Sequence, residues 1–535
     1  MAITANEAVR YWARERPADL AFLKDEDSLT WGELDARSEE LAVGMYDLGI
    51  RAGDVVGILM ENGLEYIEAY VALIKLGAIT APFSTRLTPG EVAYQVEHSD
   101  SKIVLTEPDS EPLLGEVLAQ HPQVGIYSRG SEKYPTLASL RKPGTVPPPG
   151  SEADDTLVIC YTSGTTGYPK GAMLTHASLR EVALANAAAV GYTWRDRVLA
   201  PQPFHASGGL GAAVTQFGLF NGCRIYIQTV FDPGACLKMI ERERISLTAV
   251  TTIFLERMAR HPDFASCDLT SLLDVTTGGA VISKALIETY LSKGVRITQG
   301  YGLTESSIYV AKLPSSQALE HPGTVGRPIM YTEVRVVDDD VDCPADTPGE
   351  ILVRGPGVMA GYWKSPEQTA QALRGGWLHT GDVGELDQDG YLTIRDRKKD
   401  MIISGGFNVY PAEIERIVSG LAGLSDSAVI GVPDEKWGEV GLLVVGDTDG
   451  SWDLGDLGER LSAELARYKW PRYIARFGEA LPRNGLLKVD KKILRTRFPA
   501  LSDDFVVIPR DTATADGDVE RRRALTHPRS RTDRQ

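Results

Sequence analysis

The amino-acid sequence predicts an α/β protein with a largely parallel sheet, followed by a smaller α+β domain. The first observation is a buried strand at residues 54–60 (DVVGILM), followed at 62–77 by apolar residues at helical spacing. The second observation is that short apolar runs at 78–83 (AITAPF) and 102–107 (KIVLTE) continue the alternation. Strands that alternate with amphipathic helices are typical of parallel sheets. Each connection there has to return from the carboxyl end of one strand to the amino end of the next, and a helix usually provides it.

The chain of 535 residues is long enough for more than one domain. We expect a boundary near the basic run at 397–399, which separates a large N-terminal domain (1–396) from a small C-terminal domain (397–510). The small domain has its own pattern of a helix at 411–418, strands at 428–432 and 442–445, and a helix at 457–468. The polar tail at 511–535 is too poor in apolar residues to bury a core, so we expect it to be disordered, although its arginines could bind an anionic partner.

Composition argues against several kinds of partner and of structural framework. The formal net charge of −17 disfavours nucleic acid and anionic membranes as general partners. The five cysteines are scattered and form no C-x-x-C pair, which argues against disulfide and zinc frameworks. The N-terminus has no signal-peptide pattern, and no apolar stretch is about 18 residues long. We therefore expect a cytoplasmic protein without a membrane span.

A glycine-rich loop, YTSGTTGYPKGAMLTH at 161–176, follows the apolar strand LVIC at 157–160. Such a loop can direct several backbone N–H groups at phosphate oxygens, while its hydroxyls add donors and Lys170 adds a positive charge. It is not a Walker A loop, because Pro169 stands in the place of the second glycine and no Gly-Lys-Ser/Thr follows. The sequence therefore predicts a phosphate loop of another kind; the alternative is a flexible surface turn.

The loop resembles the phosphate loop of the adenylate-forming (AMP-binding) superfamily, which includes acyl-CoA synthetases, peptide-synthetase adenylation domains and beetle luciferases. Over residues 5–500, further motifs follow in the order that is typical of the acyl-CoA synthetase branch. They are PFHASGG (203–209), TTGGA (276–280), QGYGLTES (299–306), HTGDVG (379–384), DRKKDMIISGGFNVYPAEIE (396–415) and LPRNGLLKVDKK (481–492). The resemblance implies a large adenylate-forming domain of packed α/β subdomains and a small mobile C-terminal domain with its hinge at 397–399.

The activity that this resemblance implies has two steps. ATP activates a carboxylic acid to an acyl-adenylate with release of pyrophosphate, and the acyl group then passes to coenzyme A. The first step is needed because a carboxylate oxygen leaves badly, whereas a phosphate in a mixed anhydride leaves well. The implied cofactors are ATP and Mg²⁺, with coenzyme A as a substrate, and catalysis consists mainly of positioning and charge neutralisation.

By the same resemblance, Thr304 contacts the α-phosphate and Glu305 holds Mg²⁺, a hard cation that prefers oxygen ligands. Lys488 bridges the substrate carboxylate and the α-phosphate. The family usually has glycine before that lysine, whereas this chain has Leu487, which leaves the pose of Lys488 open. The residues implied in nucleotide binding are Thr162, Ser163, Gly164, Thr165, Thr166, Gly167, Lys170, Gly278, Gly279, Ala280, Gln299, Tyr301 (stacked on adenine), Asp382 (on the ribose hydroxyls) and Arg397.

The acyl site implied by the resemblance is formed by His205, Ser207 and Gly302. Acetate-specific relatives carry tryptophan at the position of Gly302, so we expect an open pocket for a medium- or long-chain fatty acid or an aromatic acid, with a preference for aromatic or mid-sized acids. Lys399 is implied as the hinge. The glycines Gly405 and Gly406 border the passage for the pantetheine thiol.

Three alternatives remain open at this point. The acceptor could be a free-standing carrier protein, or the enzyme could adenylate nitrite to diazotise an aryl amine. The chain could also be a nucleotide-binding regulator without catalysis, which the presence of Glu305, Lys399, Gly406 and Lys488 together disfavours. The sequence does not identify the acid or the oligomeric state.

Overall fold

The protein is described here by a computed structural model, which divides into two compact units. The first unit comprises residues 1–380 and 384–394, and the second comprises 381–383 and the chain from Arg395 onward. Asp382, which we expected within the N-terminal domain, is therefore part of the second unit. The described residues are 3–162, 169–279, 282–404, 407–419, 421, 424, 426–446, 453–483, 488–502 and 504–508.

A seven-stranded sheet in the first unit carries the strand that leads into the glycine-rich loop. Its order is β19-β8-β7-β4-β3-β5-β6, with β7, β4, β3, β5 and β6 parallel. The strands predicted at 54–60, 78–83 and 102–107 are confirmed as β3, β4 and β5, and the helix predicted at 62–77 is α3. The bounds are β3 (Val55–Leu59), α3 (Leu64–Leu76), β4 (Ile79–Pro82), β5 (Ile103–Thr106), β6 (Gly125–Ser128), β7 (Thr156–Thr162), β8 (Lys170–Thr175) and β19 (Gly361–Tyr362).

A nine-stranded sheet, in the order β15-β14-β13-β12-β11-β9-β10-β1-β2, forms the other large layer of the first unit. The strands from β13 through β1 run parallel, so their carboxyl ends lie at one edge, where the motifs beginning at 203, 276 and 299 continue the chain. The bounds are β1 (Leu20–Lys24), β2 (Asp27–Thr30), β9 (Arg197–Ala200), β10 (Arg224–Ile227), β11 (Leu247–Thr251), β12 (Asp274–Gly278), β13 (Ile297–Tyr301), β14 (Ala311–Leu313) and β15 (Arg327–Pro328).

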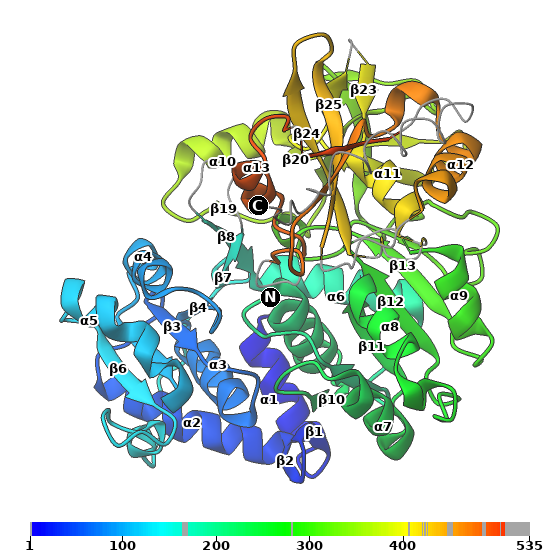
Figure 1. The fold of residues 1–535 in the computed structure, drawn as a ribbon. Coiled ribbons are helices and arrows are strands. Elements are labelled where there is room, and N and C mark those ends of the chain that lie inside the picture. The colour runs from blue at the N-terminus through cyan, green and yellow to red at the C-terminus, as the bar shows by residue number, and fades with distance from the viewer. Residues whose placement is uncertain are drawn as a thin grey trace, which may run out of the picture. The chain divides into compact units, whose positions relative to one another are not determined.

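Helices cover these two sheets, and Figure 1 shows α8 and α9 beside the strands β11–β13. Three of the helices, α1, α2 and α4, begin with capping boxes, in which the threonine N-cap and a glutamate three residues later satisfy each other's backbone N–H groups. The bounds are α1 (Ala5–Glu15), α2 (Trp31–Asp47), α4 (Pro89–Ser99), α5 (Gly115–Gln120), α6 (His176–Val190), the π-helix η3 (Ser207–Phe220), α7 (Pro233–Glu243), α8 (Thr252–Ala259), α9 (Lys284–Leu291) and α10 (Pro366–Ala372).

A five-stranded sheet has the strand order β17-β16-β18-β20-β21. Its last strand along the chain, β21, leads into the second unit. Its β20 and β21 are the strands predicted around the turn at Asp389-Gly390, and Gly390 adopts a positive φ of 79° there. The bounds are β16 (Glu333–Asp338), β17 (Val341–Asp342), β18 (Gly349–Arg354), β20 (Leu378–Leu386) and β21 (Leu392–Arg397).

The second unit has its own six-stranded sheet and its own core, in which Ile414, Val429 and Leu443 are fully buried. The helix predicted at 411–418 is confirmed as α11. The helix predicted at 457–468 is wrong at its end, because α12 stops at Glu464 and the chain continues as a 3-10 turn at Arg467–Lys469. The bounds are β22 (Ile402–Ser404), β23 (Phe407–Val409), α11 (Pro411–Val418), β24 (Ser427–Asp434), β25 (Gly438–Val445), α12 (Leu454–Glu464), β26 (Tyr473–Arg476), α13 (Lys491–Arg497) and β27 (Val506–Val507).

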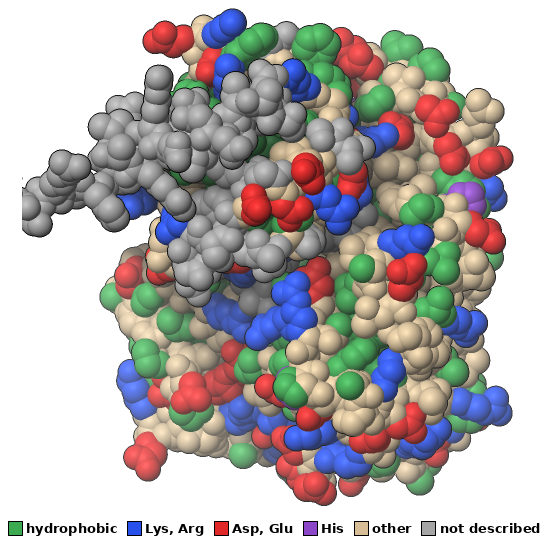
Figure 2. All heavy atoms as spheres, turned by 45° about the vertical axis from the view of Figure 1, so that its right-hand side comes forward, with side chains coloured by type: hydrophobic (Ala, Val, Ile, Leu, Met, Phe, Trp, Pro, Cys, Tyr) green, Lys and Arg blue, Asp and Glu red, His purple; other side chains and the backbone are tan. Residues whose placement is uncertain are grey.

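The surface carries charges of both signs, which are interspersed over the face shown in Figure 2. Within the described part of the chain, no helix is long and apolar enough to cross a membrane. The tail at 511–535, for which we expected disorder, lies outside the described residues.

Candidate active site

Glu305 lies at the centre of the predicted site in the first unit. It belongs to the short 3-10 turn η5 (Thr304–Ser306), which follows β13. Its carboxylate oxygen Oε1 accepts hydrogen bonds from the Thr162 hydroxyl (3.3 Å) and from the Tyr362 hydroxyl (3.0 Å). Among the described residues, no hydrogen bond reaches the second oxygen, Oε2. One oxygen therefore holds the side chain in place, and the other is available to a cation.

Tyr362 connects this carboxylate to the predicted phosphate lysine. It lies in β19, which pairs with β8, and Lys170 is the first residue of β8. The Lys170 ammonium is 5.0 Å from the centroid of the Tyr362 ring, at the distance of a cation–π contact. Burial, together with the negative charge of Glu305, raises the pKa of Tyr362. The tyrosine hydroxyl therefore keeps its proton and acts as the donor toward Glu305.

Two hydroxyl groups lie side by side next to Glu305. The Thr304 and Ser207 side-chain oxygens are 2.9 Å apart, and Ser207 is the first residue of the π-helix η3. The turn into η3 requires glycine, because a Cβ on Gly209 would lie 2.1 Å from the carbonyl oxygen of Pro203. His205 lies in the same connection between β9 and η3 and is half-buried. This arrangement presents two small polar groups beside the carboxylate.

Glycine is also required where β12 ends. A Cβ on Gly278 would lie 2.7 Å from the carbonyl oxygen of Gly300 on the neighbouring strand. Gly279 has a φ of 84°, in the left-handed region that L side chains rarely adopt. On β13, Gln299 and Tyr301 are buried, and Gln299 Nε2 has no hydrogen-bond partner in the described part of the chain. Close packing between β12 and β13 is therefore sufficient to explain the glycine at 278 without a ligand.

Three predicted residues of the second unit come together. Arg397 Nε lies 3.3 Å from Asp382 Oδ1, and the Asp382 side chain is buried while that of Arg397 is half exposed. Desolvation lowers the pKa of Lys488, the Arg397 charge lowers it further, and the Asp382 charge opposes the shift. Lys399 is exposed in the turn after β21. The unit thus places a carboxylate and two cations within electrostatic reach of one another.

The space that a side chain at Gly302 would enter is occupied by backbone, and whether the glycine borders the acyl pocket stays a prediction. A Cβ at this position would lie 1.9 Å from the carbonyl oxygen of Ile308, so any side chain meets backbone. The chain turns back sharply here, because Ser307 and Ile308 have positive φ values of 51° and 93°. A β-branched residue in that region is strained. Gly211 in η3 offers no space either, since its Cβ would lie 2.9 Å from Ile308 Cδ1.

Tyr362 was not among the site residues predicted from the sequence. The only local signal was the pair Gly361-Tyr362, and Gly361 has a positive φ of 144° in the structure. The predicted residues Ser163, Gly164, Thr165, Thr166, Gly167, Ala280, Gly405 and Gly406, together with Leu487, lie outside the described residues.

The donor set fits Mg²⁺ held jointly with a phosphate ligand. Within the described ranges, no group of three or more His, Cys, Asp or Glu side chains could hold a metal ion by itself. Mg²⁺ commonly binds through one or two carboxylates together with substrate phosphates. A single carboxylate with one available oxygen, as in Glu305, matches that mode.

Comparison with known proteins identifies similar chains over almost the whole length. The family model described as AMP-binding enzyme matches residues 9–363, and the model for the AMP-binding enzyme C-terminal domain matches 413–488. A long-chain-fatty-acid–CoA ligase of Mycobacterium tuberculosis is 37% identical over 476 residues, which are 88% of this chain and 93% of that protein. A feruloyl-CoA synthase of Amycolatopsis is 36% identical over 502 residues, which are 92% and 99% of the two chains.

A solved structure is also similar to this chain over most of its length. The o-succinylbenzoate CoA synthetase of Bacillus subtilis, in complex with its acyl-adenylate intermediate, superposes with a TM-score of 0.80 at 29% identity. The match covers 91% of this chain and 97% of that chain. The predicted fold, a large α/β domain with a small C-terminal domain, is confirmed by this similarity and by the match of the C-terminal family model.

Proposed function

The chain belongs to the AMP-binding enzyme family, and from that premise we propose that it converts a medium- or long-chain fatty acid or an aromatic acid to an acyl-adenylate and then to its coenzyme A thioester. It is an AMP-forming acid–thiol ligase that uses ATP, Mg²⁺ and coenzyme A. The observation that carries the proposal is the arrangement around Glu305, with its Oε1 fixed by Thr162 and Tyr362 and its Oε2 directed to no described partner.

We propose that the residues around Glu305 help to neutralise the charge of the nucleotide phosphates. Mg²⁺ on Glu305 Oε2 would offset the negative charge of the nucleotide phosphates. Lys170, on β8, adds a fixed positive charge, which its contact with the Tyr362 ring holds in position. The hydroxyls of Thr304 and Ser207 can donate to oxygens of the α-phosphate and of the incoming carboxylate. Preorganised donors of this kind are worth most where charge develops during the reaction.

We propose that residues at the carboxyl ends of β12 and β13 orient the nucleotide. The backbone at Gly278 and Gly279 has no side chains to obstruct a flat base, and Tyr301 at the end of β13 supplies an aromatic ring. In the second unit, Asp382 is an acceptor suited to the ribose hydroxyls, with Arg397 beside it.

Lys488 is our proposed catalytic lysine of adenylation. A carboxylate and an α-phosphate repel each other as they approach, and an ammonium between them lowers that repulsion. Desolvation and, after it, the Arg397 charge lower the pKa of Lys488, so it loses its proton more easily than an ordinary lysine, while the Asp382 charge helps to keep it protonated.

The names of the relatives, rather than Gly302, support the two classes of acid in this proposal. The names of two relatives specify a long-chain fatty acid and ferulic acid, an aromatic acid. Both classes remain in the proposal, because the backbone contact at Gly302 does not define the width of the acyl pocket.

An acid-panel assay tests the proposal. The full-length protein is incubated with ATP, Mg²⁺ and individual fatty and aromatic acids, with and without coenzyme A, and mass spectrometry follows AMP and the acyl thioester. We expect pyrophosphate release with at least one acid and thioester formation only when coenzyme A is present.

Other outcomes of this assay would overturn parts of the proposal. Pyrophosphate release without a thioester would exclude coenzyme A as the acceptor, and a second arm with a carrier protein or with nitrite and an aryl amine would identify the alternative. Nucleotide binding without pyrophosphate release on any acid would contradict an enzymatic role.

A further inference from the structure

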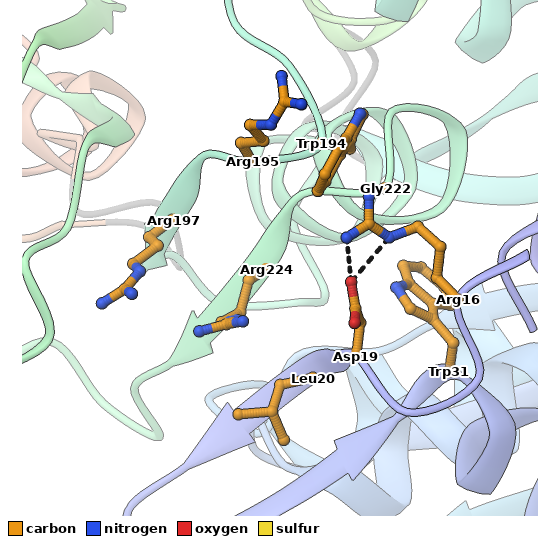
Figure 3. A pocket seen from close by; sticks show the side chains of 9 residues that line it. All are labelled: Arg16, Asp19, Leu20, Trp31, Trp194, Arg195, Arg197, Gly222 and Arg224. Carbon is orange, nitrogen blue, oxygen red and sulfur yellow. Dashed lines mark hydrogen bonds and ion pairs between the residues drawn. The ribbon is translucent and has the colours of Figure 1, made fainter.

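A second charged site lies in the first unit, at the sheet edge opposite the predicted catalytic residues. It is a cavity of about 200 Å³ (Figure 3). Arg197, Arg224 and Leu20 line it and are the first residues of the neighbouring parallel strands β9, β10 and β1. The motifs that carry Ser207 and Thr304 follow the carboxyl ends of β9 and β13. The cavity is therefore separate from the site around Glu305.

Two of the lining arginines stand side by side, and neither has an acidic partner among the described residues. Arg197 and Arg224 are opposite each other in the β9–β10 ladder and extend in the same direction in Figure 3. Arg197 Nη1 donates to the carbonyl oxygen of Glu243 at 2.6 Å, which leaves its charge uncompensated. The guanidinium of Arg224 makes no hydrogen bond or ion pair with any described residue. Neighbouring parallel strands are about 4.8 Å apart, so these two cations repel each other.

The remaining charges of the cavity add to this excess. Trp194 lies between two guanidinium groups, with the Arg16 carbon Cζ 3.2 Å and the Arg195 carbon Cζ 4.4 Å from its ring centroid. Among the described residues that line the cavity, Asp19 has the only carboxylate, and Arg16 is ion-paired with it (Figure 3). Four arginines and one carboxylate thus leave three guanidinium charges that have no acidic partner in the described part of the chain.

This local excess contrasts with the net charge of −17 of the whole chain. Arg195 is exposed, whereas Arg197 and Arg224 are half-buried, so water screens the repulsion between these two only in part. A bound anion would offset the repulsion, and the planar fork of arginine pairs bidentately with phosphate oxygens. We propose that this cavity binds a small phosphate-class oxyanion, such as inorganic phosphate or pyrophosphate, at a site separate from catalysis.

The size of the cavity limits the ligand. Pockets for drug-sized ligands have about 300–1,000 Å³, so a cavity of about 200 Å³ is too small to enclose a nucleotide. A cavity of about 150 Å³ encloses a molecule as small as benzene. An ion of one or two phosphate groups fits between these limits. An anionic lipid headgroup has the same phosphate chemistry, and the experiment has to distinguish the two sources.

Calorimetry on the full-length protein tests the proposal. The protein is first saturated with ATP and Mg²⁺, without a carboxylic acid, so that the nucleotide site is occupied, and inorganic phosphate is then titrated at constant ionic strength. We expect one phosphate to bind per chain. Arg224→Gln should weaken this binding about fivefold or more, and Arg197→Gln with Arg224→Gln about tenfold or more. The single variant removes a guanidinium that has no described partner, so it should not disturb folding.

A matched control carries the same change in net charge. Arg86 and Arg260 are exposed, and the structure shows no side-chain partner for either of them among the described residues. The double variant Arg86→Gln with Arg260→Gln should bind phosphate as the wild type does. Thermal unfolding of all variants verifies that they are folded.

Two results would overturn the proposal. The first is a phosphate titration in which the ATP-saturated wild type binds no phosphate, or in which the Arg197/Arg224 variant binds it equally well. The second comes from sedimentation with phosphatidylglycerol vesicles and with phosphatidylcholine vesicles as a control. If Arg224→Gln abolishes binding to anionic vesicles while free phosphate does not bind to the wild type, the arginines serve a lipid surface instead.

Discussion

The hydroxyl of Tyr362 donates a 3.0 Å hydrogen bond to Glu305 Oε1, which ties the short strand β19 to the turn after β13. A hydrogen bond to a charged group typically contributes about 1.5–3 kcal/mol. In our proposal this bond orients the carboxylate so that Oε2 meets Mg²⁺.

Tyr362→Phe removes the hydroxyl and retains the ring that Lys170 contacts. We expect the Mg²⁺ concentration for half-maximal pyrophosphate release to rise about tenfold, because the carboxylate loses a donor that orients it. The control is Tyr331→Phe, since Tyr331 is 68% exposed. An unchanged magnesium titration in Tyr362→Phe would show that this bond does not orient the metal ligand.

Glu305→Gln retains an acceptor for Thr162 and Tyr362 but removes the negative charge. We expect an ordinary unfolding temperature together with pyrophosphate release that requires at least about tenfold more Mg²⁺, as befits the loss of an anionic ligand. Superimposable titrations of variant and wild type would place the metal on another residue.

Gly302→Ala should destabilise the protein rather than change its choice of acid. The new Cβ would lie 1.9 Å from the Ile308 carbonyl oxygen, and relieving such overpacking typically costs about 1–3 kcal/mol or more. Chemical denaturation measures the loss. The control is Gly115→Ala, whose Cβ would meet no atom of the described residues within 4 Å. Equal stability of the two variants would contradict this packing argument.

His176 should make the stability of the first unit depend on pH. Its Nδ1 accepts a hydrogen bond from the backbone N–H of Ala5 at 3.1 Å, and this requires the neutral ring. Burial lowers the pKa of His176 from 6.5 to about 4. The unfolded chain therefore takes up the proton first as the pH falls, and the folded state loses stability between pH 6.5 and about 4.

The expected loss from His176 is about 3 kcal/mol in the free energy of unfolding across that interval, at about 1.36 kcal/mol for each pKa unit. It is measured as the difference in pH dependence between the wild type and His176→Gln, which has no titrating group at this position. Parallel stability curves for the two proteins between pH 6.5 and 4 would refute it.

Lys488→Ala should impair adenylation and leave thioester formation intact. We expect pyrophosphate release to fall about 10²–10³-fold, the usual effect of removing one preorganised charge contact. Thioester formation from a synthetic acyl-adenylate and coenzyme A measures the second half-reaction alone. The control is Lys492→Ala, an exposed lysine on α13. Equal damage to both half-reactions by Lys488→Ala would contradict its assignment to the first.

Local patterns in the sequence were sufficient for the strands β3, β4 and β5 and for the helix α3, because the spacing of apolar residues alone indicates which face is buried. Thr304 and Glu305 were predicted because they stand together in one motif. Tyr362 was not, since it reaches Glu305 through the pairing of β19 with β8, strands that lie far apart in the chain. Pairing over such separations has no local signal.

The backbone contact at Gly302 could not be predicted for a different physical reason. Its surroundings depend on the backbone angles of Ser307 and Ile308, both of which have positive φ. Neither residue type predicts such a conformation, because serine and isoleucine ordinarily avoid it. The size of a residue in a motif therefore does not reveal whether the space beside it is a pocket or another part of the backbone.

The contact between Gly302 and the Ile308 carbonyl also constrains how this protein can diverge. Every amino acid that a single nucleotide change can put in place of glycine has a Cβ, and every Cβ at 302 meets the same carbonyl oxygen. A substitution at 302 therefore costs least where an earlier change at 307 or 308 has moved this carbonyl. Descendants that retain Ser307 and Ile308 in this conformation should retain the glycine whichever acid they come to use.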